Sequence, residues 1–98
     1  MSKTLILTQA KTYFKDIKEI CELPIKSNYK IFCIKKLSNI ICSAFDNRYK
    51  DQDIDDIVDN FFTITEIVNK TSPENIDHNI LTIKNLCERN IEYLNEFL

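Results

Sequence analysis

The chain has 98 residues, which fit one domain and leave no room for a second independent hydrophobic core. Its composition, 44% hydrophobic and 29% charged, is typical of a globular protein and argues against disorder. Glycine is absent, which excludes glycine-rich phosphate-binding loops and disfavours tight hairpin turns. No stretch approaches the ~20 apolar residues of a membrane span. We therefore predict a single domain over residues 1–98 that has no membrane partner.

Apolar residues recur at steps of three and four in four consecutive blocks, and this period predicts four amphipathic helices. The predicted helices span about 3–23, 28–47, 52–70 and 73–98. Short connections between helices favour an antiparallel, up-down-up-down bundle. The sequence therefore predicts the all-α class.

Four local signals predict where the helices begin and end. Pro24 ends the first helix, because the residue before a proline is forced out of the helical region. Asn47 tolerates the left-handed conformation that often ends a helix, and it is the expected exit of the second. The acidic run 51–56 suits the first turn of the third helix. Ser72 and Pro73 are the expected N-cap and first residue of the fourth.

Each predicted helix has one apolar face that we expect to be buried. The expected inward residues are Ile6, Ala10, Tyr13, Ile17 and Ile20 in the first helix and Cys33, Leu37, Ile40, Ile41, Ala44 and Phe45 in the second. In the third they are Ile54, Ile57, Val58, Phe61, Thr65 and Val68, and in the fourth Ile76, Ile80, Ile83, Cys87, Ile91, Leu94 and Leu98.

The four cysteines, Cys21, Cys33, Cys42 and Cys87, match neither a zinc site nor a redox motif, because no two have C-x-x-C spacing. At helical spacing among apolar residues they are expected to act as small hydrophobic side chains. An alternative is a disulfide between Cys21 and Cys33 across the first connection, which would require an oxidising compartment. The apolar run among the first residues is too short for a secretion signal, so a reducing cytoplasm is the expected location.

Catalytic groups are scarce in this sequence. His78 is the single histidine, and it has no evident supporting carboxylate for nucleophilic catalysis. Glu74 and His78 are four residues apart and could share a helix face, but no third metal ligand accompanies them. We therefore expect a protein that is not an enzyme and that holds neither a cofactor nor a metal.

The acidic run was compared with a calcium-binding EF-hand loop. Its aspartates fit positions 1, 3, 5 and 9 of such a loop. Position 6 requires glycine and is Asp56, and position 12 requires glutamate and is Phe62. A solvated helix start explains the run better than a calcium site.

Charge is segregated along the chain although the net charge is only −2. Residues 24–50 carry six cations against Asp46, residues 51–72 carry six acids against Lys70, and residues 73–98 have a balance of −3. Neutralisation between adjacent helices is one interpretation. Nucleic-acid binding is disfavoured, because the cations of the basic segment form no single stripe and the whole chain is acidic.

Asp55, Asp59, Phe62 and Glu66 follow steps of four, three and four, so they share one strip of the third helix. In one interpretation Phe62 widens the core and the acids are ordinary surface. In the other, an aromatic anchor among carboxylates forms a surface for a basic protein. The candidate partner-binding residues are Asp55, Asp56, Asp59, Phe62 and Glu66.

The fourth helix carries a second apolar flank. Leu86, Tyr93 and Phe97 lie beside its main apolar stripe. This flank is either covered by a neighbouring helix or available as a contact for a dimer or a partner.

These features favour a non-catalytic protein-binding module. The expected role is an inhibitor of the immunity-protein or antitoxin type, which neutralises a basic partner, such as a nuclease, through its acidic helix. This comparison rests on size and charge. The alternatives are a homo-oligomeric structural or adaptor subunit, with a homodimer as one form, and a nucleic-acid-associated helical protein.

Overall fold

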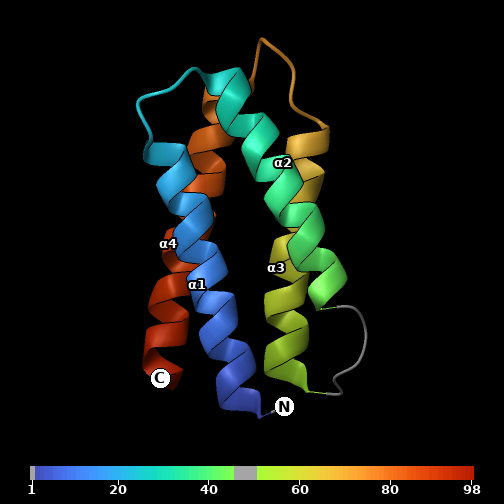
Figure 1. Cartoon of the computed structure of the whole chain (residues 1–98), viewed down its shortest axis with the longest axis vertical. Helices are drawn as coiled ribbons and strands as arrows, with labels where there is room; N and C mark the ends of the chain where they lie inside the picture. Colours follow the sequence, from blue (N-terminus) through green and yellow to red (C-terminus); the bar gives the residue numbers. More distant parts are fainter. Residues whose placement is uncertain (1, 46–50) are drawn as a thin grey trace.

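The computed structural model describes residues 2–45 and 51–98, which contain four α-helices and, within these ranges, no strand. The helices are α1 (Lys3–Glu22), α2 (Ser27–Ala44), α3 (Gln52–Asn69) and α4 (Ile76–Phe97). Successive helices run in opposite directions, and α1 begins at the end of the bundle where α4 finishes (Figure 1). The predicted all-α antiparallel bundle is confirmed.

Both α1 and α3 begin at a side-chain cap. Ser2 Oγ accepts a hydrogen bond from the backbone N–H of Leu5 at 3.1 Å. Asp51 Oδ1 accepts from the backbone N–H groups of Asp53 and Ile54 at 2.9 and 3.2 Å. These bonds satisfy donors that have no partner inside the first turn, and the Asp51 carboxylate also complements the helix dipole. The acidic run is therefore a helix start, as the sequence predicted.

Each of the two prolines was used to predict a helix boundary, and the structure agrees with one of these predictions and not with the other. α1 ends at Glu22, two residues before Pro24, as predicted. α4 begins at Ile76 and not at residue 73, so the predicted start was wrong. The cause is a turn over residues 72–75, in which Asn75 Oδ1 accepts from the Ser72 backbone N–H at 2.7 Å. Asn75, and not Ser72, is the residue that precedes the first turn.

The buried face of α2 matches the predicted one only in part. Ile41 and Phe45 are buried and Leu37 is partly buried, as predicted. Cys33, Ile40 and Ala44 were predicted to be buried and are exposed, whereas Ile34 and Ser38 are buried instead. This part of the prediction was wrong because apolar side chains occur on opposite sides of the helix, and its sequence therefore gives no unique inward direction. The structure ends α2 at Ala44, and the predicted exit at Asn47 lies outside the described residues.

The other three helices largely confirm their predicted faces. The buried hydrophobic residues of the whole bundle are Ile6, Leu7, Ala10, Phe14, Ile17, Cys21, Ile34, Ile41, Phe45, Ile54, Ile57, Phe61, Ile64, Val68, Ile80, Ile83, Cys87 and Leu94. Tyr13 and Ile20 are only partly buried, because the face of α1 that meets the core lies nearer to Leu7 and Phe14. Leu98 was predicted to be buried and is exposed, since it lies beyond the last turn of α4.

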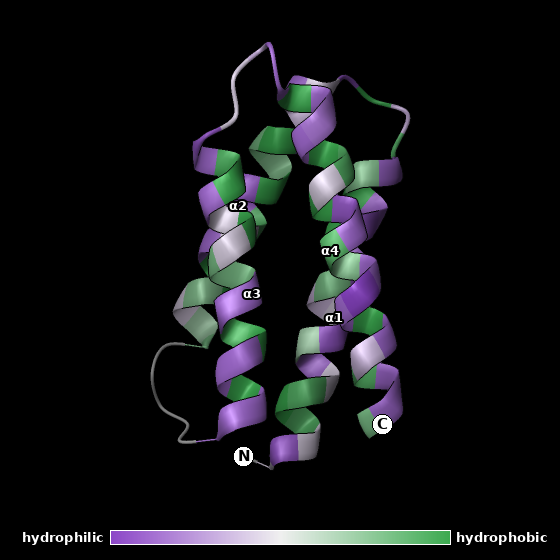
Figure 2. Cartoon of the chain, turned by 180° about the vertical axis from the view of Figure 1, so that it is seen from behind, coloured by the Kyte–Doolittle hydropathy of each residue, from purple (hydrophilic) through white to green (hydrophobic). Residues whose placement is uncertain are grey.

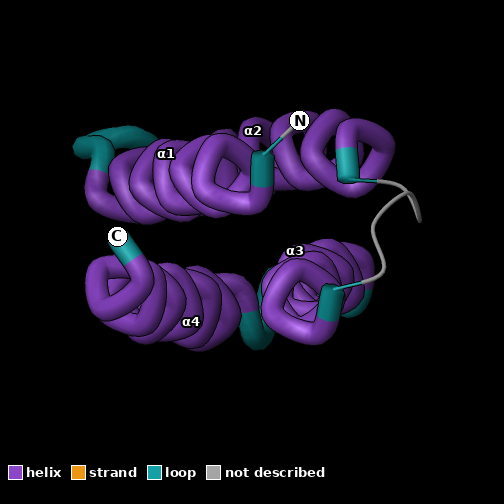
Figure 3. Tube along the Cα trace, turned by 90° about the horizontal axis from the view of Figure 1, so that it is seen from below, coloured by secondary structure: helices purple, strands orange, loops and turns teal. Residues whose placement is uncertain are grey.

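The helices occupy the corners of a square in the order α1, α2, α3, α4 when the bundle is seen along its axis (Figure 3). The most extensive packing joins α1 to α4 and α2 to α3. Figure 2 shows hydrophobic segments on all four helices, and the buried residues among them form one core.

Aromatic side chains fill the space between the two helix pairs. Phe14 of α1 and Phe61 of α3 stack with ring centroids 4.1 Å apart. Phe45 stacks on the same Phe61 ring at 5.8 Å, and the partly buried Tyr13 meets Phe45 edge-on at 5.9 Å. Such pairs add about 0.5–1.5 kcal/mol each to the burial of their area, so this cluster ties three helices together.

All four cysteines lie within the described residues and are free. Cys21 and Cys87 are buried, whereas Cys33 is exposed on α2. The structure therefore does not contain the alternative disulfide between Cys21 and Cys33. Burial raises the pKa of the Cys21 thiol to about 11 and also raises the pKa of Cys87. The two buried thiols behave as hydrophobic core groups, as the sequence predicted.

Candidate protein-binding surface

The acidic strip, defined as Asp55, Asp59, Phe62 and Glu66, is exposed along its whole length on α3. The core face of the same helix carries Ile54, Ile57, Phe61, Ile64 and Val68. At 100° per residue the strip is centred roughly 150° from that face, on the side of the helix next to α2. The strip therefore faces solvent on the outer side of the α2/α3 pair.

Two carboxylates of the strip have no ion-pair partner among the residues that the structure describes. Asp55 and Asp59 are separated by one helical turn and repel each other. Glu66 is paired with Lys70 at 2.7 Å, and this hydrogen-bonded ammonium lowers the pKa of the Glu66 carboxyl. Both side chains of that pair are exposed, so Glu66 remains accessible.

Phe62 is 52% exposed and lies outside the cluster of buried and partly buried hydrophobic residues. The interpretation that it widens the core is therefore wrong. An aromatic side chain left half in water gains little from folding, because the stabilisation follows the apolar area removed from water. The Phe62 ring therefore contributes little to the stability of the bundle.

Asp56 was included among the candidate residues but lies apart from the strip. One residue beyond Asp55, it is turned by about 100° around the helix. Its Oδ1 atom accepts a hydrogen bond from Gln52 Nε2 at 2.9 Å. Asp56 is exposed, so it adds negative potential beside the strip without joining it.

The outer face of α2 next to the strip was missed by the sequence analysis. Phe32 is 58% exposed, and Lys36 Nζ lies 5.3 Å from the centre of its ring. Together with Lys35 and Asn39 these residues line a surface depression of about 300 Å³. The sequence did contain a pattern that could have identified this face. Tyr29, Phe32 and Lys36 are separated by steps of three and four, which is the spacing of the last three residues of the acidic strip.

The α4 flank, predicted as a candidate oligomer contact, is engaged inside the chain. Leu86 is partly buried against the core. Tyr93 packs edge-on against Phe97 at 5.1 Å, and its hydroxyl donates a hydrogen bond to Asp53 Oδ1 at 3.3 Å. Lys3 Nζ lies 5.8 Å from the Phe97 ring centre and also binds Asp53 at 2.7 Å. Tyr93 and Phe97 nevertheless remain 39% and 45% exposed, so this network leaves part of the flank open to solvent.

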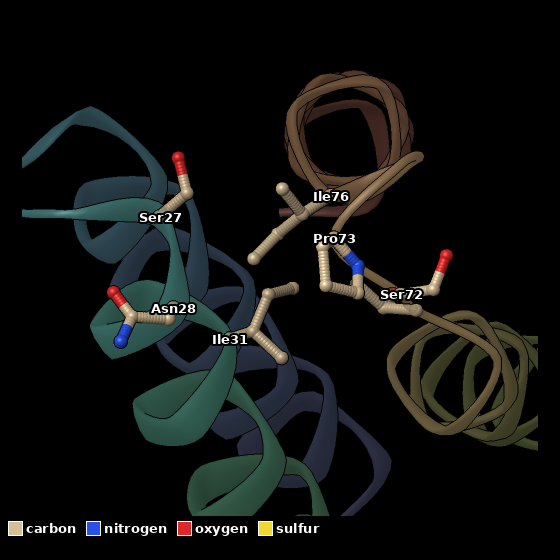
Figure 4. Close-up of a pocket in the computed structure, with 7 residues that line it drawn as sticks. Ser27, Asn28, Ile31, Ser72, Pro73 and Ile76 are labelled. Carbon is tan, nitrogen blue, oxygen red and sulfur yellow. The ribbon is translucent and has the colours of Figure 1, made fainter.

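A pocket lies between the start of α2 and the turn before α4 (Figure 4). It has a volume of about 450 Å³, and Ile31, Pro73 and Ile76 turn toward one another across it. Ser27 and Asn28 lie on its rim, and Ser27 donates to Asp77 Oδ1 at 2.6 Å. The residues that line it include no titratable side chain.

His78 is exposed in the first turn of α4, on the surface as the sequence predicted. Within residues 2–45 and 51–98, no three histidine, cysteine or acidic side chains are grouped so that they could hold a metal ion. In the same ranges no helix is both long and apolar enough to cross a membrane.

Comparison of the chain with protein-family models, with curated proteins and with solved structures gives no match.

Proposed function

We propose that the chain is a non-catalytic protein-binding module that recognises a basic protein through the acidic strip. The observation that carries this proposal is the exposure of Phe62 between carboxylates on the same face of α3. Asp59 lies one turn before Phe62 and Glu66 one turn after it. An apolar centre with charged neighbours is the usual anatomy of a protein-binding hot spot.

A basic partner would relieve two unfavourable features of this surface at once. Its apolar atoms would remove the Phe62 ring from water, which is worth about 25 cal/mol for each Å² buried. Its cations would offset the mutual repulsion of Asp55 and Asp59. Long-range attraction to the acidic surface would also accelerate association at low ionic strength.

The partner class follows from the size and charge of the module. A small rigid bundle with an acidic face suits an inhibitor that covers the nucleic-acid-binding or active surface of a basic enzyme. Immunity proteins and antitoxins that block nucleases act in this way, and we place this chain with them by function. Such a role is expected in the cytoplasm, where a nuclease of the same cell must be neutralised.

The test is affinity capture from the native source followed by mass spectrometry. The variant Asp55→Lys/Asp59→Lys/Glu66→Lys reverses the strip, and Asp16→Lys/Glu19→Lys/Glu96→Lys makes the same charge change at exposed positions of α1 and α4. We expect the wild type and the α1/α4 variant to retain one basic protein that the strip variant loses. Equal retention by all three chains would refute the strip as the binding site.

A further inference from the structure

The outer side of α2 carries a basic patch, defined as the four residues that line the depression of about 300 Å³, which are Phe32, Lys35, Lys36 and Asn39. At 100° per residue this patch is centred roughly 140° from the buried face of α2. Cys42, which contacts Thr65 of α3, is rotated from that buried face in the same sense. The basic patch therefore lies on the same outer side of the α2/α3 pair as the acidic strip.

The charges of α2 and α3 are opposite in sign, but they do not neutralise each other. Within its bounds α2 has three lysines and no acid, whereas α3 has five acids and no cation. None of the ion pairs among the described residues involves α2. Lys30 Nζ donates to the Cys21 carbonyl oxygen at 2.8 Å. The ammonium groups of Lys35 and Lys36 thus have no ion-pair partner in the described ranges and can bind a group from another molecule.

The two charged groups do not pair because they are displaced along the helix axes. The contact between Cys42 Sγ and Thr65 Oγ1 at 3.5 Å places these two residues at one level. Lys36 lies six residues before Cys42, and Asp59 lies six residues before Thr65. Since the helices are antiparallel, these separations add, and at 1.5 Å per residue the two charges are about 18 Å apart along the axis. This exceeds the screening length of about 8 Å at physiological ionic strength, so the two ends act as separate charges.

From this arrangement we infer that the contact surface of the protein partner is itself dipolar. It carries carboxylates that meet the basic patch and, about 18 Å away, cations that meet the acidic strip. Such a surface is attracted at both ends, whereas a surface with cations alone is attracted by the strip and repelled by Lys35 and Lys36. This inference rests on the proposed function, because it specifies the protein that the acidic strip binds.

The basic patch has the groups that a carboxylate side chain requires. Its two ammonium groups supply charge-assisted hydrogen bonds, and the Asn39 amide adds a neutral donor. Lys36 Nζ lies 5.3 Å from the centre of the Phe32 ring, and the ring itself is 58% exposed. A partner that covers this ring also removes apolar area from water. The patch is thus the counterpart of the acidic strip, with cations in place of carboxylates around an exposed aromatic ring.

A protein suits this surface better than a nucleic acid does. The phosphates of a nucleic-acid strand carry one sign of charge along their whole length. A strand that binds Lys35 and Lys36 and continues along the pair of helices therefore meets the carboxylates of Glu66 and Asp59. A protein surface can change sign over the same distance. Single-stranded DNA is accordingly one of the probes in the test.

The experiment titrates the nitrogen-15-labelled chain with synthetic peptides at low ionic strength and follows the backbone amide shifts. The dipolar peptide is an alanine-based helix with a glutamate cluster and a lysine cluster centred about 18 Å apart. Two further peptides carry glutamates only or lysines only at the same positions. We expect the dipolar peptide to shift the amides of both the basic patch and the acidic strip. It should bind at least about tenfold more tightly than either uniform peptide, because each end raises the effective concentration of the other.

The variant Lys35→Glu/Lys36→Glu reverses the basic patch, and Lys15→Glu/Arg89→Glu makes the same charge change at exposed positions of α1 and α4. We expect the patch variant to bind the dipolar peptide at least about tenfold more weakly and the control to stay within about threefold of the wild type. Far-ultraviolet circular dichroism verifies that both are folded. A dipolar peptide that binds no more tightly than the lysine peptide would overturn the inference. So would a folded patch variant with unchanged affinity, or a single-stranded oligonucleotide that binds the patch more tightly than the dipolar peptide.

The captured basic protein separates this inference from the proposed function, because the same patch variant then has effects of opposite sign. A dipolar contact surface predicts that Lys35→Glu/Lys36→Glu weakens its binding at least about tenfold, whereas a purely basic surface predicts tighter binding. Unchanged or tighter binding, together with a loss on reversal of the acidic strip, would refute the dipolar surface alone. Binding that survives reversal of the strip and is lost on reversal of the patch would refute the strip as the binding site.

Discussion

Phe61 and Phe62 are neighbours in the sequence and lie in opposite surroundings. Phe61 is fully buried and stacks on Phe14 with ring centroids 4.1 Å apart, whereas Phe62 is 52% exposed. Consecutive helical residues are turned by 100°, so one of the pair serves the core and the other reaches the surface. This contrast separates what the bundle needs for stability from what it presents to other molecules.

Truncating these two phenylalanines should have very different effects on stability. Phe61→Ala removes the ring on which Phe14 and Phe45 stack, and we expect a loss of about 3–5 kcal/mol in the free energy of unfolding. Phe62→Ala should change it by no more than about 0.5 kcal/mol. Urea unfolding followed by circular dichroism measures both. A large loss for Phe62→Ala would mean that this ring is structural.

The helices could be predicted from the sequence because the period of three and four is strong in three of them. In α3 the residues between the inward Ile54, Ile57 and Phe61 are acidic or polar except for Val58, which is partly buried against the core, and this leaves one direction for the core. The exposure of the acidic strip follows from the same period, so its residues could be identified without the structure.

The orientation of α2 could not be predicted in this way. Ile34 and Ile41 point inward while Phe32 and Ile40 point outward, and all four are equally apolar by type. Only the packing of α2 against its neighbours selects the buried side. The outer face of α2 that carries Phe32 and Lys36 was missed for this reason, since it depends on which side of α2 remains exposed. The start of α4 was misplaced because the Asn75 side chain closes a turn that propensity rules assign to the helix.

The ionic cluster at the start of α1 and α3 should make stability depend on pH. Lys3 lies 3.1 Å from Asp51 and lowers the pKa of its carboxyl below the ordinary value of 3.8. A depressed pKa contributes stability that is present above the unfolded-state value and is lost as pH falls through the folded-state value. For Lys3 the pKa is raised, chiefly by its hydrogen bond to Asp53, so its contribution is lost only above about pH 10.

The variant Asp51→Asn isolates this effect, because asparagine caps a helix as well as aspartate but carries no charge. We expect the wild type to melt at a higher temperature than Asp51→Asn at neutral pH. The difference should begin to shrink near the ordinary pKa of 3.8 and vanish only below the lowered folded-state pKa of Asp51. Asp16→Asn, an exposed α1 position without an ion pair in the described ranges, is the control. A difference that persists unchanged in acid would contradict the assigned contact.

The cysteines should react with a thiol-alkylating reagent in an order set by burial. Cys33 is exposed and should be modified first in the native protein, followed by the partly buried Cys42. Cys21 and Cys87 are buried with raised pKa values, so little thiolate is available at neutral pH, and they should react only on unfolding. Peptide mass spectrometry after timed quenching gives the order. Early modification of Cys87 would show that the α1/α4 core opens readily.

The α4 flank should matter for stability and not for association. Tyr93→Ala and Phe97→Ala remove an edge-on aromatic contact and, for Tyr93, a hydrogen bond to Asp53. We expect each to lower the melting temperature while the mass in solution stays that of the wild type at equal concentration. Light scattering coupled to size-exclusion chromatography measures that mass. A fall in mass for either variant would restore this flank as an oligomer contact.

The affinity of the captured basic protein for the chain, measured by isothermal titration calorimetry, tests the role of the acidic strip most directly. Phe62→Ala should weaken binding about 30-fold or more, as expected of a buried anchor. Asp55→Lys/Asp59→Lys/Glu66→Lys should weaken it further and remove most of its dependence on ionic strength. The matched α1/α4 variant should stay within about threefold of the wild type, a difference of less than 1 kcal/mol. An affinity that neither strip variant changes would contradict the assignment of this surface.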